Sequence, residues 1–273
     1  MSDNSVGIYI GPNDCSIAVI RNKKIEIIPN ENGNRTTPSV IQLSSNQIFI
    51  GRANENILKE NPKNTVYGIR EIIGKNFDDP DLQKFINKVP FKIEKDLETG
   101  KPKIIVKYLR RITSFFPEQI YTMLIQKLID LSKNYIGGDD IKNVLITVPS
   151  YYNNSQREAS KNAGKACGVN TLRIVSEETA ACYAYKLYKD KKKKNILVFN
   201  MRSNETNVTI LNLQNDGFKV IETVRDDNLG GISFKEELIK YCINEFKGQT
   251  GIIIQKDSKS YRRLEKECEG FKI

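Results

Sequence analysis

The sequence has 273 residues, 39% of them hydrophobic, and a formal net charge of +10 at pH 7. This length suits one large domain or two small ones, and the hydrophobic share excludes an intrinsically disordered chain. Because there is no histidine, a Ser-His-Asp triad, a Cys-His pair and a histidine metal ligand are all excluded.

The cysteines and the N-terminus bear on the cellular compartment. Five cysteines are scattered along the chain without a C-x-x-C pair, which favours reduced thiols over a disulfide framework or a zinc site. Residues 1–5 lack the basic and apolar regions of a signal peptide, and no apolar stretch approaches the roughly 18 residues of a membrane span. We therefore expect a cytoplasmic protein without membrane contact.

The first predicted elements are three strands in a meander. Residues 6–10 form an apolar run that ends in the turn Gly11-Pro12-Asn13-Asp14, and residues 15–20 and 24–28 give two more strands. The same layout returns over residues 195–223. Two matching meanders roughly 190 residues apart predict an internally duplicated fold.

Helices alternate with strands between and after these meanders. Amphipathic periodicity and capping boxes predict helices over residues 117–136, 155–168 and 178–188 and from 233 onward, and apolar runs predict strands over 144–148 and 172–175. Residues 40–115 have shorter apolar runs and are expected to form an inserted subdomain. The alternation indicates the α/β class.

Six segments, taken in order and at their spacing, resemble one family. They are residues 6–11, 30–39, 61–66, 146–153, 172–181 and 229–231. Together they are similar to the ATPase domain of the DnaK-type seventy-kilodalton heat-shock chaperones. The resemblance implies the actin-like ATPase fold, with a first lobe at residues 1–188 and a second at 189–273 around a nucleotide cleft. It also implies that the second lobe is incomplete and that the family's peptide-binding domain is absent.

The resemblance assigns phosphate and adenosine contacts to positions that partly depart from the family pattern. They are Gly11, Pro12, Asn13, Arg202, Ser203, Asn204, Gly230 and Gly231 for the phosphates, and Glu269 and Lys272 for the adenosine. Glycine-rich turns bind phosphate through backbone N–H groups, and Pro12 has none. Ordinary turns are the alternative interpretation of all three loops.

Metal-binding positions depart further. Tyr9, Asn200 and Asn207 are neutral where the family places carboxylates, and Mg²⁺ requires oxygen anions. Glu205 adds a negative charge near the expected phosphates, for which Arg202 can partly compensate. We expect ATP or ADP as ligand but no complete Mg²⁺ site.

Four further residues carry roles that the resemblance implies. Arg70 stands where the family has a catalytic lysine, and Glu177 matches the acid near the metal and attacking water. Pro149 and Arg157 match residues that relay the nucleotide state between domains. The alternative for Arg70 is a solvated surface arginine, and for Glu177 it is a helix cap. For Pro149 and Arg157 the alternative is a packing or surface role.

The run at residues 189–194 contains five lysines and one aspartate. It is interpreted as a solvated loop and not as a nucleic-acid patch, because no aromatic residues interleave with it.

Three functions remain open from the sequence. The first is a chaperone-family domain that binds ATP or ADP with weak or absent hydrolysis. The second is a nucleotide-independent interaction module for co-chaperones or exchange factors, and the third is an inactive truncated family member. We further expect residues 190–273 to be the less stable half, because both faces of their central strand carry apolar residues.

Overall fold

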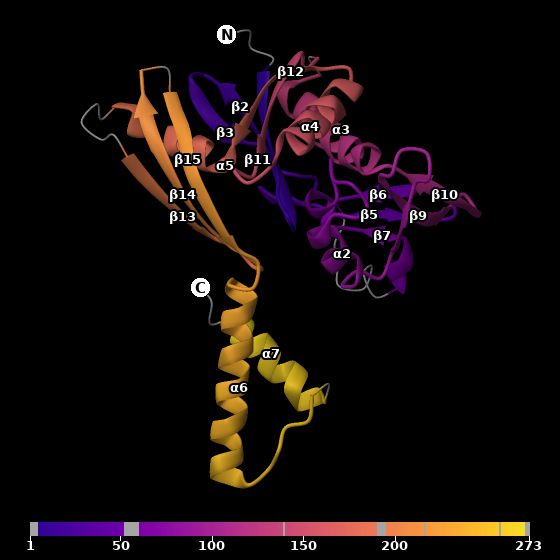
Figure 1. Cartoon of the computed structure of the whole chain (residues 1–273), viewed down its shortest axis with the longest axis vertical. Coiled ribbons are helices and arrows are strands. Elements are labelled where there is room, and N and C mark those ends of the chain that lie inside the picture. Colours follow the sequence, from indigo (N-terminus) through magenta and orange to yellow (C-terminus); the bar gives the residue numbers. More distant parts are fainter. Residues whose placement is uncertain are drawn as a thin grey trace. The chain divides into compact units, whose positions relative to one another are not determined.

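The computed structural model describes residues 5–51, 60–138, 140–189, 195–215, 217–256 and 258–270. The chain divides into two compact units, Met1–Glu177 and Glu178–Ile273 (Figure 1).

A six-stranded sheet organises the first unit. Its path runs β12-β11-β1-β2-β3, with β4 paired to β2. The strands are β1 (Ser5–Ile10), β2 (Asp14–Arg21), β3 (Lys24–Ile27), β4 (Thr37–Pro38), β11 (Asn143–Val148) and β12 (Asn170–Ser176). The first meander is confirmed, because β1, β2 and β3 pair antiparallel, whereas β11 lies parallel to both β1 and β12.

Two amphipathic helices cover this sheet. Helix α3 (Pro117–Ile136) packs on β1 and β2, and α4 (Asn154–Ala166) packs on β11, β12 and α3. Alternate residues of β1 are buried, so Val6, Ile8 and Ile10 all point into one core. This arrangement of strands and helices confirms the α/β class.

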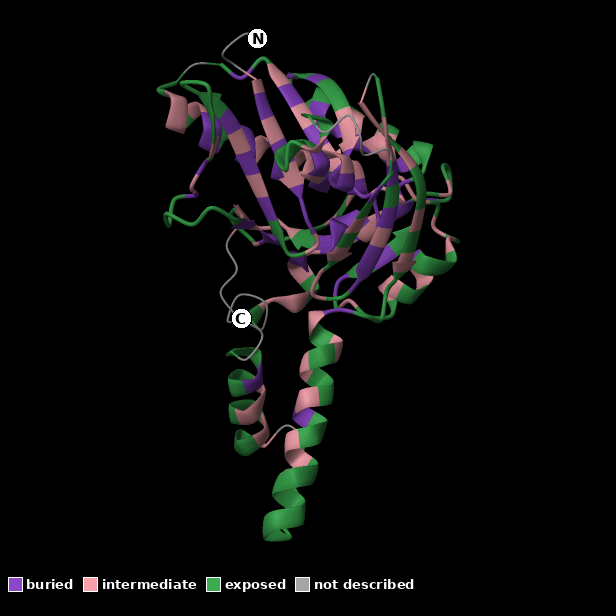
Figure 2. Ribbon diagram, turned by 90° about the vertical axis from the view of Figure 1, so that its left-hand side faces the viewer, coloured by how far each residue is buried: buried purple, intermediate pink, exposed green. Residues whose placement is uncertain are grey.

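Smaller elements lie between β4 and α3 in the chain. One sheet joins β5 (Ile41–Leu43), β6 (Ile48–Ile50) and β7 (Thr65–Val66), and a second joins β8 (Lys92–Lys95), β9 (Pro102–Tyr108) and β10 (Arg111–Phe115). The turns η1 (Pro62–Asn64) and η2 (Ile69–Glu71) and helix α2 (Pro80–Ile86) connect them. Their buried residues belong to the same hydrophobic core as those of the large sheet. Figure 2 marks the buried positions in purple.

The second unit contains one antiparallel sheet and several helices. The sheet orders β13 (Asn195–Met201), β14 (Thr206–Gln214) and β15 (Gly217–Asp226), which confirms the second meander. The helical elements are α5 (Glu177–Ala184), whose first residue is the last of the first unit, η3 (Leu187–Lys189), α6 (Gly231–Thr250) and α7 (Lys259–Gly270). Helix α5 ends before the predicted limit at residue 188, because Lys186 takes a positive φ of 57°.

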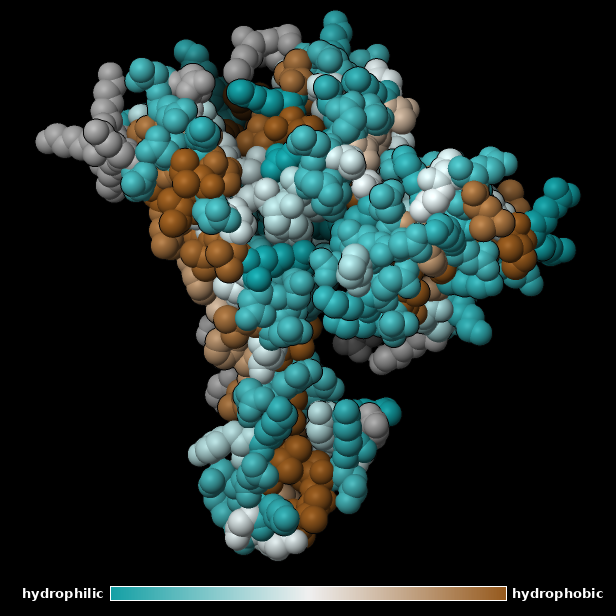
Figure 3. All heavy atoms as spheres, viewed as in Figure 1, coloured by the Kyte–Doolittle hydropathy of each residue, from teal (hydrophilic) through white to brown (hydrophobic). Residues whose placement is uncertain are grey.

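Burial differs between the two sides of this small sheet. Ile196 and Leu211 pack with Cys182 of α5 in a small core. Leu197, Phe199 and Val224 point to the opposite side, where they are 64%, 58% and 66% exposed. Figure 3 shows brown, hydrophobic atoms on the surface over these strands. One face of the sheet is therefore apolar and open to solvent.

Candidate functional site

The first candidate phosphate loop is the turn between β1 and β2. The Gly11 N–H donates to the Asp14 carbonyl at 2.8 Å, and the Ser39 N–H donates to the Asn13 carbonyl at 2.7 Å. A methyl group on Gly11 would lie 2.5 Å from the Tyr9 hydroxyl oxygen, so the phenol occupies the space beside the loop. Burial raises the pKa of the Asp14 carboxyl. The Gly11 N–H is thus used inside the turn, and the position of the family's acid holds a neutral ring.

Arg70 and Glu177 form a buried ion pair. Arg70 Nη2 lies 3.2 Å from Glu177 Oε1, and the two residues are 2% and 9% exposed. Arg70 belongs to the turn η2, and Glu177 begins α5 directly after β12. Arg70 is therefore not a solvated surface arginine, because its charge is compensated inside the protein.

Two tyrosines complete the surroundings of Arg70. The Tyr152 hydroxyl donates to the Arg70 carbonyl at 2.8 Å. Burial raises the pKa of Tyr121 to about 12 and that of Tyr152 well above its usual value, while the Arg70 charge opposes both shifts. Both phenols therefore stay neutral beside the guanidinium, and Glu177 supplies a balancing negative charge.

The second candidate loop joins β13 and β14, and its charged side chains form ion pairs within the protein. Glu205 is 5% exposed, and its carboxylate lies 3.0 Å from Arg202 Nη1 and 2.8 Å from Arg225 Nη2. The Asn207 amide donates to the same carboxylate at 3.3 Å. Asn200 pairs with Asn207 across the two strands. Glu205 is thus not a repelling surface charge but the buried partner of two arginines.

Helix α6 begins against this loop. The N–H groups of Gly231 and Ile232 donate to the carbonyls of Arg202 and Ser203, each at 2.8 Å. The Gly230 N–H donates to Ser233 Oγ at 2.8 Å. A Cβ on Gly230 would lie 2.6 Å from the Ser203 carbonyl, so only glycine permits this approach. The structure brings Gly230 and Gly231 to the 202–204 loop, where the Gly231 N–H is used by the Arg202 carbonyl, while the Gly230 N–H is used by Ser233 within the helix cap.

The candidate adenosine residues are only partly described. Glu269 of α7 lies 3.4 Å from Lys235 Nζ of α6. Lys272 lies outside the described residues, as does the basic run except for Lys189.

Arg157, in the first turn of α4, reaches back to Pro149 in the loop between β11 and α4. Arg157 donates from Nε to the Tyr152 carbonyl at 3.0 Å, and from Nη2 to the carbonyls of Ser150 and Pro149 at 3.1 and 3.5 Å. The guanidinium therefore fixes the loop that positions Tyr152 over Arg70.

A Mg²⁺ ion does not fit the residues at these positions. Tyr9, Asn200 and Asn207 offer no carboxylate, and the part of the chain that the structure describes holds no group of three acidic or cysteine side chains suited to a metal. Over the same part, no helix is long and apolar enough to cross a membrane.

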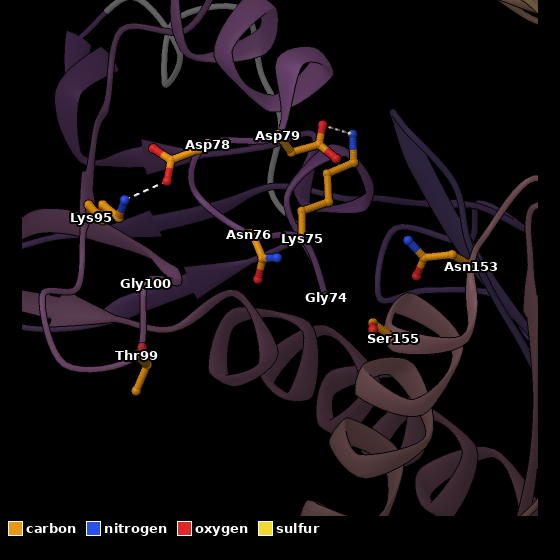
Figure 4. Close-up of a pocket in the computed structure, with 10 residues that line it drawn as sticks. All are labelled: Gly74, Lys75, Asn76, Asp78, Asp79, Lys95, Thr99, Gly100, Asn153 and Ser155. Carbon is orange, nitrogen blue, oxygen red and sulfur yellow. Dashed lines mark hydrogen bonds and ion pairs between the residues drawn. The ribbon is translucent and has the colours of Figure 1, made fainter.

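Sequence reasoning missed two cavities in the first unit, each of about 570 Å³. One is polar and includes Lys75, paired with Asp79 at 3.3 Å, and Lys95, paired with Asp78 (Figure 4). The other adjoins the first loop and is lined mainly by Pro12, Asn13, Asp14, Pro38, Val40, Pro62, Tyr67 and Pro90. Four of these eight residues are prolines and Asp14 adds a carboxylate, so the lining is unfavourable for a phosphate.

Sequence reasoning also missed Tyr121, Tyr152 and Arg225. Tyr152 lies inside the 146–153 segment, so its place beside a buried charge had a partial signal. Arg225 faces Asn207 only because of the register between β14 and β15, which the sequence pattern does not determine.

Comparison with known proteins places the whole of this architecture in one family. The family model described as Hsp70 protein matches residues 5–273. The chain is 37% identical over 271 residues to "Heat shock 70 kDa protein 2" of Paracoccidioides lutzii, covering 98% of this chain and 41% of the relative. It is 36% identical over 272 residues to a heat shock protein of Pyricularia oryzae, covering 99% of this chain and 44% of the relative.

The chain thus spans about two-fifths of the length of these curated relatives. The matched portion starts at the first described strand and includes both meanders. The chain therefore belongs to the Hsp70 family, and its α/β fold is the actin-like ATPase fold of the family's nucleotide-binding domain.

Proposed function

We propose that this chain acts as an Hsp70-type nucleotide-binding domain that binds ATP or ADP weakly and hydrolyses ATP very slowly or not at all. The family match over residues 5–273 supports nucleotide binding. The start of α6 indicates that the binding is weak, because Gly231 and Ile232 already donate their N–H groups to the carbonyls of Arg202 and Ser203. Helix N-termini bind phosphate through such N–H groups. A phosphate at this point must break existing hydrogen bonds before it can form new ones.

The replaced acids support slow hydrolysis. Tyr9 and Asn200 are neutral, and the residues present do not suit Mg²⁺. Each loss of about 1.4 kcal/mol of transition-state stabilisation slows a reaction tenfold, and the loss of one positioned electrostatic contact commonly costs more than this. We therefore expect a rate orders of magnitude below that of an ordinary family member.

Single-turnover hydrolysis and calorimetric titration test the proposal together. We expect no measurable hydrolysis and weak binding of ATP or ADP that changes little between excess Mg²⁺ and EDTA. A hundredfold loss of affinity in EDTA, or an ordinary family rate, would contradict the proposal.

A variant with both acids restored sharpens the test. The double variant Tyr9→Asp/Asn200→Asp should gain Mg²⁺ dependence. Asn195→Asp, at the exposed opposite end of β13, adds the same charge away from the loop and should not.

A nucleotide-independent interaction module is the second candidate. It is favoured by the way in which the protein neutralises its own buried charges: Glu177 compensates Arg70, and Glu205 compensates Arg202. Neither arginine needs a phosphate to be stable. If calorimetry detects no binding of millimolar ATP or ADP to the folded protein, this candidate is favoured. Its proposed partners are co-chaperones or exchange factors of the family.

A further inference from the structure

The hairpin of β9 and β10 gives one small sheet of the first unit a free edge. The sheet runs β10-β9-β8, and within the described residues β10 pairs with β9 alone (Figure 1). Leu109 and Arg110 form the turn with φ angles of 48° and 62°, and two positive values are typical of a type I′ turn. Such a two-residue turn makes the flanking residues, Tyr108 and Arg111, a hydrogen-bonded pair.

The register of this hairpin determines which backbone groups face outward. Hydrogen-bonded and non-hydrogen-bonded pairs alternate along an antiparallel ladder. Because Arg111 is in a hydrogen-bonded pair, Thr113 and Phe115 also bond to β9, and the N–H and C=O groups of Ile112 and Ser114 point away from it. Among the described residues, none of these four backbone groups has another hydrogen-bond partner. They are spaced as in a strand that lacks its neighbour.

The edge is also apolar and regular. Many edge strands are interrupted by a proline or a bulge, which prevents pairing with another chain. Strand β10 contains no proline, and its pairing with β9 shows no shift of register. Ile112 is 75% exposed and Leu109 is 53% exposed. Figure 3 shows hydrophobic atoms beside hydrophilic ones at this end of the first unit. An added strand would cover part of this apolar surface.

The charges at this edge are all positive. Residues 107–115 contain three charged side chains, and these are Lys107, Arg110 and Arg111. All three are exposed, and none has an ion-pair partner among the described residues. Two copies of this edge would bring like charges together, which destabilises a strand pair, whereas a carboxylate on the added strand stabilises it. The charges therefore favour an acidic partner over a second copy of this chain.

We propose that the free edge of β10 binds an extended peptide of alternating acidic and apolar residues, which joins the sheet as an additional strand. The peptide backbone bonds to the outward N–H and C=O groups of Ile112 and Ser114, as in other cases of strand addition. Successive side chains of a strand point to opposite faces. The apolar residues of the peptide therefore lie beside Ile112 on one face, and the acidic residues lie beside Arg111 on the other.

Strand β3 provides a matched comparison within the same unit. It is also an edge strand, it follows a similar turn at residues 22 and 23, and its register gives Ile25 the same outward position as Ile112. Ile25 is 74% exposed. The two edges differ at the next residue, which is Thr113 on β10 and Glu26 on β3. The Glu26 carboxylate repels an acidic strand, so we expect the peptide to select β10.

Fluorescence anisotropy with the whole chain tests the binding. The probe is a fluorescein-labelled peptide of about seven residues that alternates glutamate and valine. We expect saturable binding, and a peptide of alternating lysine and valine should bind about tenfold more weakly or worse. The glutamate–valine peptide methylated at its central backbone nitrogens keeps its charge but loses its donors, and it should also bind about tenfold more weakly. Equal binding of the methylated peptide would overturn the proposal, because charge alone would then explain the attraction.

Two proline variants locate the site. Ile112→Pro removes an N–H that makes no bond within the fold, and proline is tolerated where an edge-strand N–H faces solvent. This variant should weaken binding about tenfold, whereas Ile25→Pro, the matched change on β3, should leave it unchanged. Arg111→Glu reverses a charge without changing the backbone and should also weaken binding, with hydrogen exchange in β9 confirming that the variants fold. Unchanged binding by Arg111→Glu, or a loss in Ile25→Pro alone, would refute the proposed site.

Discussion

Removal of the Glu177 carboxylate should destabilise the first unit strongly. Glu177→Ala leaves the Arg70 guanidinium buried, at 2% exposed, without its ion-pair partner and next to two neutral phenols. Breaking a buried pair by removing one partner costs about 3–5 kcal/mol. Because both residues are less than a tenth exposed, solvent screening gives little relief.

Urea unfolding measures this loss. For a slope of about 2 kcal/mol per molar, the midpoint of the first unit should fall by about 2 M. The midpoint is read from hydrogen exchange in α3, because the chain contains no tryptophan. Glu158→Ala, an exposed change on α4, should shift the free energy of unfolding by less than about 0.5 kcal/mol.

The double variant Arg70→Met/Glu177→Leu separates charge from packing. Replacing both members of a buried pair by apolar residues is commonly neutral or stabilising, so most of the lost stability should return. If Glu177→Ala behaves like Glu158→Ala, the ion pair does not compensate Arg70 and the reasoning is wrong.

Three further predictions concern other parts of the structure. Gly230→Ala places a methyl group 2.6 Å from the Ser203 carbonyl, so it should cost about 1–3 kcal/mol and speed amide exchange at the start of α6. In the unmodified chain, segments of the second unit should exchange faster than β1 and β11, because its buried core is small; equal slow exchange in both units of a verified monomer would contradict this. The hydrogen bond from Lys103 lowers the pKa of Asp96, so this carboxylate stabilises the fold above the ordinary pKa of 3.8 and loses the effect as pH falls through its lower folded value. Lys103→Met should move the Asp96 titration upward in an NMR pH series, and an unchanged titration would exclude the pairing.

The fold was more accessible to sequence reasoning than the site. Alternating apolar residues and turn chemistry predicted both meanders, and capping residues predicted α3 and α4, because these signals are local. The burial of Arg70 had no such signal, since it lies in a three-residue turn without periodicity. The pairing of Glu205 with Arg225 depends on the register between β14 and β15, which no local signal determines.

The buried carboxylate of Glu205 acts as a tethered competitor for any anion that approaches Arg202. It is part of the chain, so dilution never removes it, and a phosphate must displace it to reach the guanidinium. Losing a hydrogen bond to a charged group costs about 1.5–3 kcal/mol, which corresponds to roughly a 10- to 150-fold weaker apparent affinity. Under the proposed function, Glu205→Gln should lower that barrier for a phosphate, although Glu205 never has to touch the ligand.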